Sequence, residues 1–426
     1  MSMKLIMLAI FLITYYFIIF GKVSKSIIAF SMGVLVLMLK ISSELRIESI
    51  GEYVDFDTLA LLMGMMIIVG VLKTTGVFEA VSAYIVKISK GNFIQIFVMI
   101  LIATALLSGI LDNVTTVLLF SPIVFLICQE AEIDPKVFAF PMIFASNIGG
   151  TLTLIGDPPN ILIGNASRTG FVDFFKIMAV PTLLSLAISI FIFLAQYKEI
   201  KNISPEKLAK LSQLDPKKAI TDYKLLIKGS IIFALVILGF VLKDKLQYES
   251  SVIALAGAAL MLIFSKTTFE HIAKDIEWDT IFFFIGLFII VKGLEEVNII
   301  ADVAAALSTF ASHPFMMIMT VLALSAVLSS FIGAVPVVTI FIPVLEIIIP
   351  SVPKGYLLWW ALALGANFAS NTTIVASACN MVVVGLLESN FKEKVSFFEF
   401  MKKGIPITMM GLAISALYLT GLFYLF

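Results

Sequence analysis

The stretch NIGGTLTLIGDPPNILIG, from 147 to 164, lies inside a long apolar region, yet it contains residues that interrupt a helix. Its glycines permit backbone torsions outside the helical range, and Pro158-Pro159 can begin a helix without the backbone donors that proline lacks. Asp157, directly before the two prolines, can cap the new helix. The stretch therefore predicts a helix that breaks and restarts in apolar surroundings.

The composition identifies those surroundings as a membrane. Of the 426 residues, 60% are hydrophobic and 14% are charged, whereas a soluble domain is about half apolar and a quarter charged. Cys128 and Cys379 both lie in apolar segments, which argues against a disulfide framework. The first apolar run, 5–20, lacks the charge and cleavage pattern of a signal peptide, so we assign it as a transmembrane helix. The sequence predicts an all-α polytopic protein of the lipid bilayer, with no nucleic-acid partner.

Hydropathy predicts the spanning elements, since a helix needs about 20 apolar residues to cross a bilayer. The predicted helices are 4–20, 26–42, 57–75, 176–197, 229–243, 250–265, 278–292 and 404–425, with interrupted helices at 137–166 and 356–388. Two longer apolar regions, 93–130 and 314–350, are broken near their middle. We interpret both as re-entrant hairpins, which enter and leave the membrane on one side.

The two halves of the sequence repeat. The aligned pairs are FDTLALLMGM (56–65) with WDTIFFFIGL (278–287), LSGILDNVTTVLLFSP (107–122) with LSSFIGAVPVVTIFIP (328–343), SNIGGTLTLIGDPPN (146–160) with ANFASNTTIVASACN (366–380), and Pro181 with Pro406. The offset stays between 220 and 225 residues, and the order is the same. A fixed offset indicates an internal duplication.

The duplication predicts the domain organisation. Residues 1–197 form a first repeat, 198–228 a linker and 229–426 a second repeat. With one hairpin and one interrupted helix, each repeat crosses five times, so the second repeat is inverted. Lys and Arg are concentrated on the linker side, whereas the loop 41–56 is acidic. The positive-inside rule then predicts a cytoplasmic linker and both termini outside, in the plasma membrane.

Broken helices inside a membrane indicate an ion or substrate site. Irregular backbone is tolerated there only where it is buried in protein or lines a cavity. A break exposes partially positive N–H groups at one half-helix and C=O groups at the other. Inverted repeats with discontinuous helices meeting near the midplane are typical of secondary transporters.

The hairpin tip Leu111–Thr116 is the second polar element at membrane depth. An intramembrane carboxylate such as Asp112 is costly and therefore a candidate for function. Asn113, Thr115 and Thr116 add oxygen atoms suited to a hard cation such as Na⁺. The aligned tip, 333–336, is apolar. We therefore predict at most one charged cation site.

Other polar residues have simpler interpretations. Asp57 and Asp279 precede Thr and a long apolar run, so each is expected to cap its helix. Solvent exposure without a metal or catalytic role is expected for Glu346, Glu388, His271 and His313.

These motifs resemble those of the ion transporter superfamily over 26–425. Within it, GDPPN and the DN-V-T-T tip are most similar to the branch that holds the melanosomal P protein and arsenite-permease-like proteins. NhaD-type sodium/proton antiporters and divalent-anion/sodium symporters are more distant relatives. The resemblance implies homodimers and an elevator motion of a transport domain against a dimerising scaffold.

The resemblance also implies the ligands of the ion and substrate. In the first half they are Asp112, Asn113, Thr115, Thr116, Asn147, Gly149, Gly150, Thr151, Asp157 and Asn160, with Na⁺ at Asp112, Asn113 and Asn147. In the second half they are Asn367, Ser370, Asn371, Thr372, Thr373, Ser377 and Asn380. The branch usually has Asp-Asn-Ile-Pro at the second tip, where this chain has Gly-Ala-Val-Pro from Gly333. It usually has Gly-Gly-Asn in the second interrupted helix, where this chain has Ala-Ser-Asn from Ala369.

The leading functional prediction is an ion-coupled secondary transporter without a cofactor other than a coupling ion such as Na⁺. No Walker A motif is present, which leaves open only a separate ATPase partner. HExxH and GxSxG motifs are absent, so the chain is not predicted to be an enzyme. With Asp112 and Asp157 and no Lys or Arg expected at either broken site, cation binding and proton exchange are favoured, although half-helix N-termini equally suit an oxyanion. Na⁺/H⁺ exchange or arsenite-like export is therefore preferred slightly over Na⁺-coupled uptake of a dicarboxylate or citrate. A channel is the alternative of another class, and saturable, gradient-driven flux would exclude it.

Overall fold

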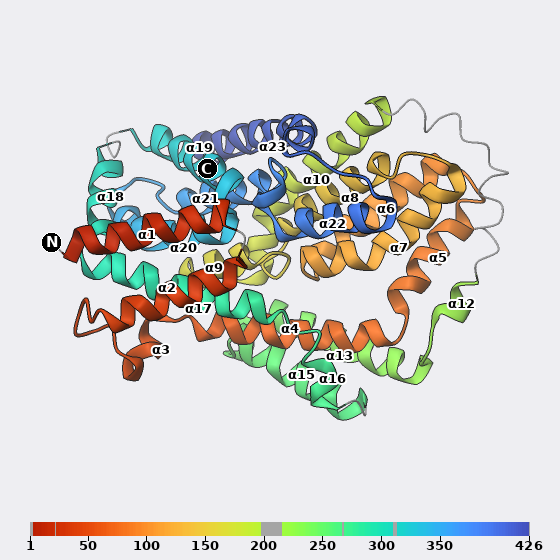
Figure 1. The fold of residues 1–426 in the computed structure, drawn as a ribbon, viewed down its shortest axis with the longest axis horizontal. Coiled ribbons are helices and arrows are strands. Elements are labelled where there is room, and N and C mark those ends of the chain that lie inside the picture. The colour runs from red at the N-terminus through yellow and green to blue at the C-terminus, as the bar shows by residue number, and fades with distance from the viewer. Residues whose placement is uncertain (1–2, 22, 197–214, 266–267, 310–312, 426) are drawn as a thin grey trace.

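The structure is a computed structural model that describes residues 3–21, 23–196, 215–265, 268–309 and 313–425 (Figure 1). Within those ranges the regular elements are all helices, which confirms the predicted all-α class. Of the predicted linker, residues 198–214 lie outside the described residues.

The first half contains α1 (Met3–Phe20), α2 (Lys25–Met38), α3 (Ile50–Tyr53), α4 (Phe56–Thr74), α5 (Val77–Ile88), α6 (Phe93–Ser108), α7 (Asn113–Ala131), α8 (Lys136–Gly150), α9 (Pro158–Ala166) and α10 (Phe171–Gln196). The linker contributes α12 (Pro216–Ala219). The second half contains α13 (Tyr223–Val241), α14 (Lys243–Leu246), α15 (Ser250–Ser265), α16 (Phe269–Ile272), α17 (Trp278–Glu296), α18 (Ile299–Ser308), α19 (Pro314–Ile332), α20 (Ala334–Ile348), α21 (Leu357–Ala369), α22 (Ala378–Phe391) and α23 (Phe397–Leu425).

Both predicted interrupted helices are broken. Between α8 and α9, and again between α21 and α22, the chain leaves the helical conformation at the aligned positions. The regions 93–130 and 314–350 are likewise each divided into two helices, at the tips expected from Asp112 and Gly333. At Gly333 the φ angle is +92°, which only glycine adopts readily.

The described helices are suited to a membrane. Eight of them are long and apolar enough to cross one, judged by length and composition: α1, α4, α7, α10, α13, α19, α20 with the turn that follows it, and α23. The two parts of each broken helix are shorter, 15 and 9 residues in α8 and α9 and 13 and 14 in α21 and α22. The chain is therefore an integral membrane protein by its architecture.

The helices pack in groups that combine the two halves. Helix α17 of the second half packs against α1 and α2, and α4 of the first half packs against α13 and α15 (Figure 1). Helices α6 to α8 gather towards one end of the molecule, and α18 to α21 gather towards the other (Figure 1). Helix α7 also contacts α22, and α20 contacts α9. The two breaks are thus brought together between the hairpins.

The sequence analysis assigned no helix to 77–88 or to 299–308, where α5 and α18 lie. Both helices are amphipathic and short, with 12 and 10 residues. Glu79, Lys87 and Asp302 interrupt their hydropathy, so a search for long apolar runs does not find them. They occupy equivalent places, directly after α4 and α17.

Candidate functional site

The glycines of the first break allow close packing. A Cβ at Gly149 would lie 2.1 Å from the carbonyl oxygen of Ala105 on α6. A Cβ at Gly150 would lie 2.3 Å from Asn113 Oδ1 at the hairpin tip. Neither residue has a positive φ angle, nor does Gly156. The expectation that these glycines supply unusual torsions is therefore wrong, and they are needed because α6 and the tip lie against the backbone.

The hairpin tip binds the first break through its asparagine. Asn113 Nδ2 donates to Asp157 Oδ2 at 2.8 Å and lies 3.4 Å from Asn147 Oδ1. Asn113 Oδ1 accepts from Ser108 Oγ at 2.5 Å. The structure thus brings together three of the predicted ligands, on the tip and on both sides of the break.

Asp112 caps α7. Its Oδ1 accepts a hydrogen bond from the backbone N–H of Thr115 at 2.7 Å, and its own carbonyl oxygen accepts from Thr116 Oγ1. The side chain is only partly buried. One carboxylate oxygen is therefore held by the helix, and the other has no hydrogen-bond partner among the described residues.

Asp157 does not cap α9 with its side chain, although it occupies the N-cap position. The expectation of a side-chain cap is wrong because the carboxylate turns to Asn113 instead. The first two residues of α9, Pro158 and Pro159, have no N–H group to cap. The N–H of Asn160 donates to the carbonyl oxygen of Asp157 at 2.9 Å instead.

An asparagine spans each break. Asn160 Nδ2 donates to the carbonyl oxygens of Gly150 and Thr153 at 2.9 and 2.8 Å. Asn380 makes the same pair of bonds in the second break, to Ser370 and Thr373 at 2.7 and 2.8 Å. Each amide thus satisfies carbonyl groups that the interruption frees, which are costly to bury unpaired.

Amides also join the two breaks. Asn147 Nδ2 lies 3.0 Å from both Asn371 Oδ1 and Asn380 Oδ1, and Asn367 Nδ2 donates to Asn160 Oδ1 at 2.7 Å. All five side chains are fully buried. The centre of the molecule therefore holds buried amide hydrogen bonds to which both halves contribute, and Asn367 Oδ1 is left there without a hydrogen-bond partner among the described residues.

Most of the remaining predicted ligands already form hydrogen bonds to other protein groups through their hydroxyl groups. The hydroxyl groups with a protein partner belong to Thr116, Thr151, Thr372, Thr373 and Ser377. Thr115 differs, because its side chain lines a cavity. Among the hydroxyl residues predicted as ligands, it is the one that a solute in that cavity meets first.

Lys25 is a site residue that the sequence analysis missed. It begins α2, and its ammonium group donates to the carbonyl oxygen of Val375 at 3.0 Å, in the second break. No carboxylate lies within ion-pair distance of it among the described residues. The conclusion that no Lys or Arg lies at either broken site is therefore wrong. The two residues are 350 positions apart, so no local pattern could reveal the contact.

Asp57 and Asp279 do not cap their helices. The cap of α4 is Asp55, which accepts from the N–H of Thr58 at 2.9 Å. Asp57 accepts instead from Ser251 at the start of α15, and Asp279 accepts from Ser26 at the start of α2. Each aspartate joins a helix of one half to a helix of the other, and the capping prediction is wrong for both.

The exposure expected for the outlying residues is found in the structure. The side chains of Glu346, Glu388, His271 and His313 are exposed. Among the described residues, no group of three or more His, Cys, Asp or Glu side chains is placed to hold a metal ion. Any bound Na⁺ would therefore depend on amide, hydroxyl and backbone oxygens besides a carboxylate.

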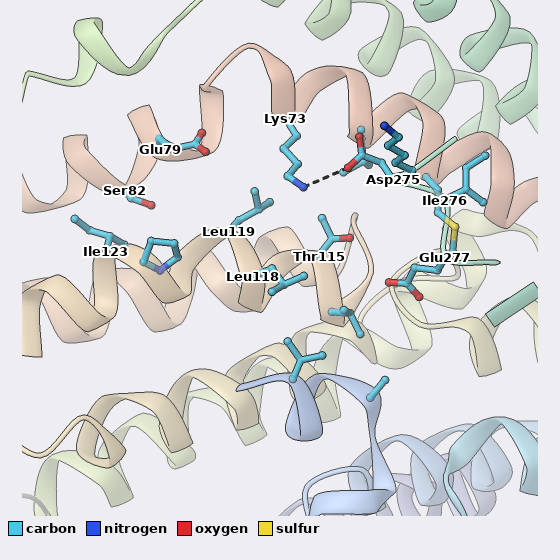
Figure 2. Close-up of a pocket in the computed structure, with 18 of the residues that line it drawn as sticks. Lys73, Glu79, Ser82, Thr115, Leu118, Leu119, Ile123, Asp275, Ile276 and Glu277 are labelled. Carbon is cyan, nitrogen blue, oxygen red and sulfur yellow. Dashed lines mark hydrogen bonds and ion pairs between the residues drawn. The ribbon is translucent and has the colours of Figure 1, made fainter. Parts of the chain in front are cut away.

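A cavity of about 1480 Å³ reaches the hairpin tip from the linker side. Its walls include α4, α5, α7, the linker residues around α12 and the segment 274–280 (Figure 2). A second cavity of about 710 Å³ lies against α9 and α20 and contains Asp55 and Asn165. The two cavities approach the centre along different hairpins.

Replacing Asp157 with Asn tests its role at the break. We expect coupled ion flux per folded molecule to fall by roughly 10-fold, the effect of about 1.4 kcal/mol, because the carboxylate charge is lost. The yield and melting temperature should stay unchanged, since Asn can accept from Asn113 and no cap is removed. Flux and thermal unfolding of the purified variant are the measurements. A lower yield with unchanged flux per molecule would instead assign Asp157 a structural role.

The fold resembles solved transporters. The YdaH transporter of Alcanivorax borkumensis superposes with a TM-score of 0.60 at 14% identity, over 100% of this chain and 99% of that one. MtrF of Neisseria gonorrhoeae, described as one of a class of antimetabolite efflux pumps, gives a TM-score of 0.56 at 12% identity, over 96% and 97%. At these identities the similarity shows the fold alone.

Sequence relatives cover almost the whole chain. A 46 kDa membrane protein of Mycobacterium leprae is 35% identical over 98% of both chains. An uncharacterized transporter of Synechocystis is 28% identical over 95% of this chain and 94% of its own. The P protein of Mus musculus is 28% identical over 95% of this chain, which spans 58% of that longer protein.

The family model described as citrate transporter matches residues 15–365. This range includes the first break, the first hairpin and most of the second half up to α21. The chain therefore belongs to the CitMHS family of membrane transporters.

Proposed function

We propose that this protein is an ion-coupled secondary transporter that moves a small carboxylate-type anion together with a cation by alternating access. The observation that carries the proposal is the contact between Lys25 and the second break. A partly buried ammonium group without a carboxylate partner is costly, and a bound anion would compensate its charge. The family description as citrate transporter agrees with an anionic cargo.

The first break supports the cation in this proposal. Asp112 and Asp157 both lie near Asn113 at the first hairpin tip, and no lysine or arginine is paired with either among the described residues. A cation bound there would compensate the carboxylates. One break thus suits a cation and the other an anion, as coupling requires.

We also propose that the two halves are inverted repeats. The support is reciprocal packing: α2 with α17 corresponds to α15 with α4, and α7 with α22 corresponds to α20 with α9. The hydrogen bonds that the Asn160 and Asn380 side chains donate across their breaks correspond in the same way. An elevator motion, a homodimer, and a plasma-membrane location with the linker cytoplasmic and both termini outside complete the proposal.

A second candidate function is cation exchange, Na⁺ against H⁺, or export of an arsenite-like species. The contact of Asn113 with the Asp157 carboxylate favours it, since such a site can hold a cation without any anion. The two candidates differ in cargo. Uptake of labelled citrate and dicarboxylate into proteoliposomes, under imposed Na⁺ or proton gradients, separates them.

Replacing Lys25 with Gln is expected to raise the anion concentration for half-maximal uptake by at least about 10-fold. The corresponding value for the coupling cation should change little, because the substitution removes a positive charge from the second break only. Lys25→Arg should retain most of the affinity, since arginine keeps the charge. Concentration series of labelled anion in proteoliposomes give these values.

Lys354 offers a matched control, because its ammonium group also donates to a backbone carbonyl, that of Phe423 at 2.6 Å. Lys354→Gln should leave the anion dependence unchanged. An equal loss in both variants, or an unchanged anion dependence in Lys25→Gln, would contradict the assignment of Lys25 to the cargo.

A further inference from the structure

The larger cavity has an electrostatic character that favours cations. Its charged lining residues are the acids Glu79, Asp215, Asp275, Glu277 and Asp279 and the bases Lys73, Lys218 and Lys274. The Lys73 ammonium group donates to Asp275 Oδ1 at 3.3 Å (Figure 2). This ion pair cancels one positive and one negative charge of the lining. A low-dielectric cleft with excess negative charge concentrates cations from solution.

Glu277 lines this cavity. It directly precedes α17, and its Oε2 accepts from Thr280 Oγ1 at 2.9 Å. Figure 2 shows its carboxylate and the Thr115 hydroxyl on facing walls of the same space. Burial raises the pKa of Glu277, and the negative charge of Asp112 raises it further. Thr115 of the hairpin tip and Glu277 thus line one cavity.

Comparison with the first half distinguishes Glu277 from a simple helix cap. In its aligned residue, Asp55, Oδ1 accepts from the N–H of Thr58, and Oδ2 accepts from Thr58 Oγ1 and, at 3.4 Å, from Asn165 Nδ2 of α9. Glu277 makes no cap bond to its own helix backbone. No amide of a broken helix donates to it among the described residues, and it lines the larger cavity. Its carboxylate therefore faces the cavity.

We propose that Glu277 is the cation-accepting group of this cavity. It binds a small cation, Na⁺ or a proton, that enters from the linker side, and passes it to the first hairpin tip at Asp112. Thr280 holds one carboxylate oxygen in place, and the Thr115 hydroxyl offers an oxygen on the path. The inference deepens the proposed function, because it rests on cation coupling and names the residue through which the cation arrives.

Binding of ²²Na⁺ to the purified protein, measured by scintillation proximity, tests the proposal without any cargo. We expect saturable binding by the wild type and an affinity weaker by at least about 10-fold in Glu277→Gln. Gln can still accept from Thr280, so the local structure is kept. Glu346→Gln is the matched control, since Glu346 lines the second cavity, and it should bind as the wild type does. Thermal unfolding verifies that each variant is folded.

A proton arm uses Trp278, which neighbours Glu277, as a fluorescent reporter in a Trp359→Phe, Trp360→Phe background. The chain has three tryptophans, so this background leaves one. In Na⁺-free choline buffer, we expect a titration that Glu277→Gln abolishes if the proton is the cation. If only Na⁺ binding depends on Glu277, the cation is Na⁺. If only the fluorescence titration depends on Glu277, the cation is H⁺.

The outcomes separate this inference from the proposed function. Cation binding by the wild type that persists unchanged in Glu277→Gln overturns the role of Glu277 and leaves cation coupling intact. Absence of both Na⁺ binding and a proton titration in the folded wild type overturns the cation coupling itself, and the inference with it. Loss of binding in Glu346→Gln as well would also count against a specific role for Glu277.

Discussion

Replacing Asp112 with Asn is expected to reduce ion-coupled flux by about 100-fold or more, which corresponds to roughly 3 kcal/mol of lost interaction. The substitution removes the charge that would hold a cation at the hairpin tip. It retains the cap of α7, because an Asn Oδ1 can accept from the N–H of Thr115 as Asp112 does. The expected variant is therefore folded and inactive, as measured by flux per molecule in proteoliposomes together with thermal unfolding.

Asp222 provides a control of the same geometry. It precedes α13 and accepts from the N–H of Leu225 at 2.9 Å, without any contact to a broken helix among the described residues. Asp222→Asn should transport as the wild type does. Wild-type flux in Asp112→Asn would remove Asp112 from the mechanism, and an equal loss in both variants would assign the effect to capping.

Replacing Gly149 with Ala is expected to produce the second large effect. The new Cβ would lie 2.1 Å from the carbonyl oxygen of Ala105, and that atom belongs to the backbone of α6. Helices α6 and α8 must then separate, at a cost of about 1–3 kcal/mol in the free energy of unfolding. The hairpin tip moves away from the first break as a result. We expect a lower melting temperature and a loss of flux of more than about 10-fold.

Gly385 on α22 is the matched control, because a Cβ there would meet nothing within 4 Å. Gly385→Ala should raise or preserve the melting temperature, since alanine favours a helix by up to about 1 kcal/mol over glycine. Unchanged stability and flux in Gly149→Ala would show that α6 and α8 are not packed as the structure describes.

The sequence predicted the architecture well where a local signal exists. Each break is marked by glycine, proline or clustered polar residues inside an apolar run, and each hairpin tip by a polar residue or by Gly333. The predicted interrupted helix 356–388 accordingly corresponds to the helices 357–369 and 378–391, of which the second ends three residues beyond the predicted end. The short amphipathic helices α5 and α18 were missed because their charged residues interrupt the apolar runs.

The site was predicted less completely, for reasons of geometry. Asn113, Asn147 and Asp157 are predicted as ligands from residue type, and the structure brings their side chains together. The direction of a side chain cannot be read from its position, which is why Asp157 was expected to cap a helix that it does not cap. Lys25 reaches Val375 across most of the chain. Only the tertiary fold brings these residues together, and their contact supports the proposed anionic cargo.

The most direct test of the central claim measures uptake of labelled citrate and internal pH together in proteoliposomes, under an imposed Na⁺ or proton gradient. We predict saturable anion uptake that requires one of these cation gradients and disappears in Asp112→Asn. Na⁺-driven proton movement without any anion uptake would contradict an anionic cargo and favour cation exchange. Unsaturable flux that needs no coupling gradient would contradict a transporter and indicate a channel.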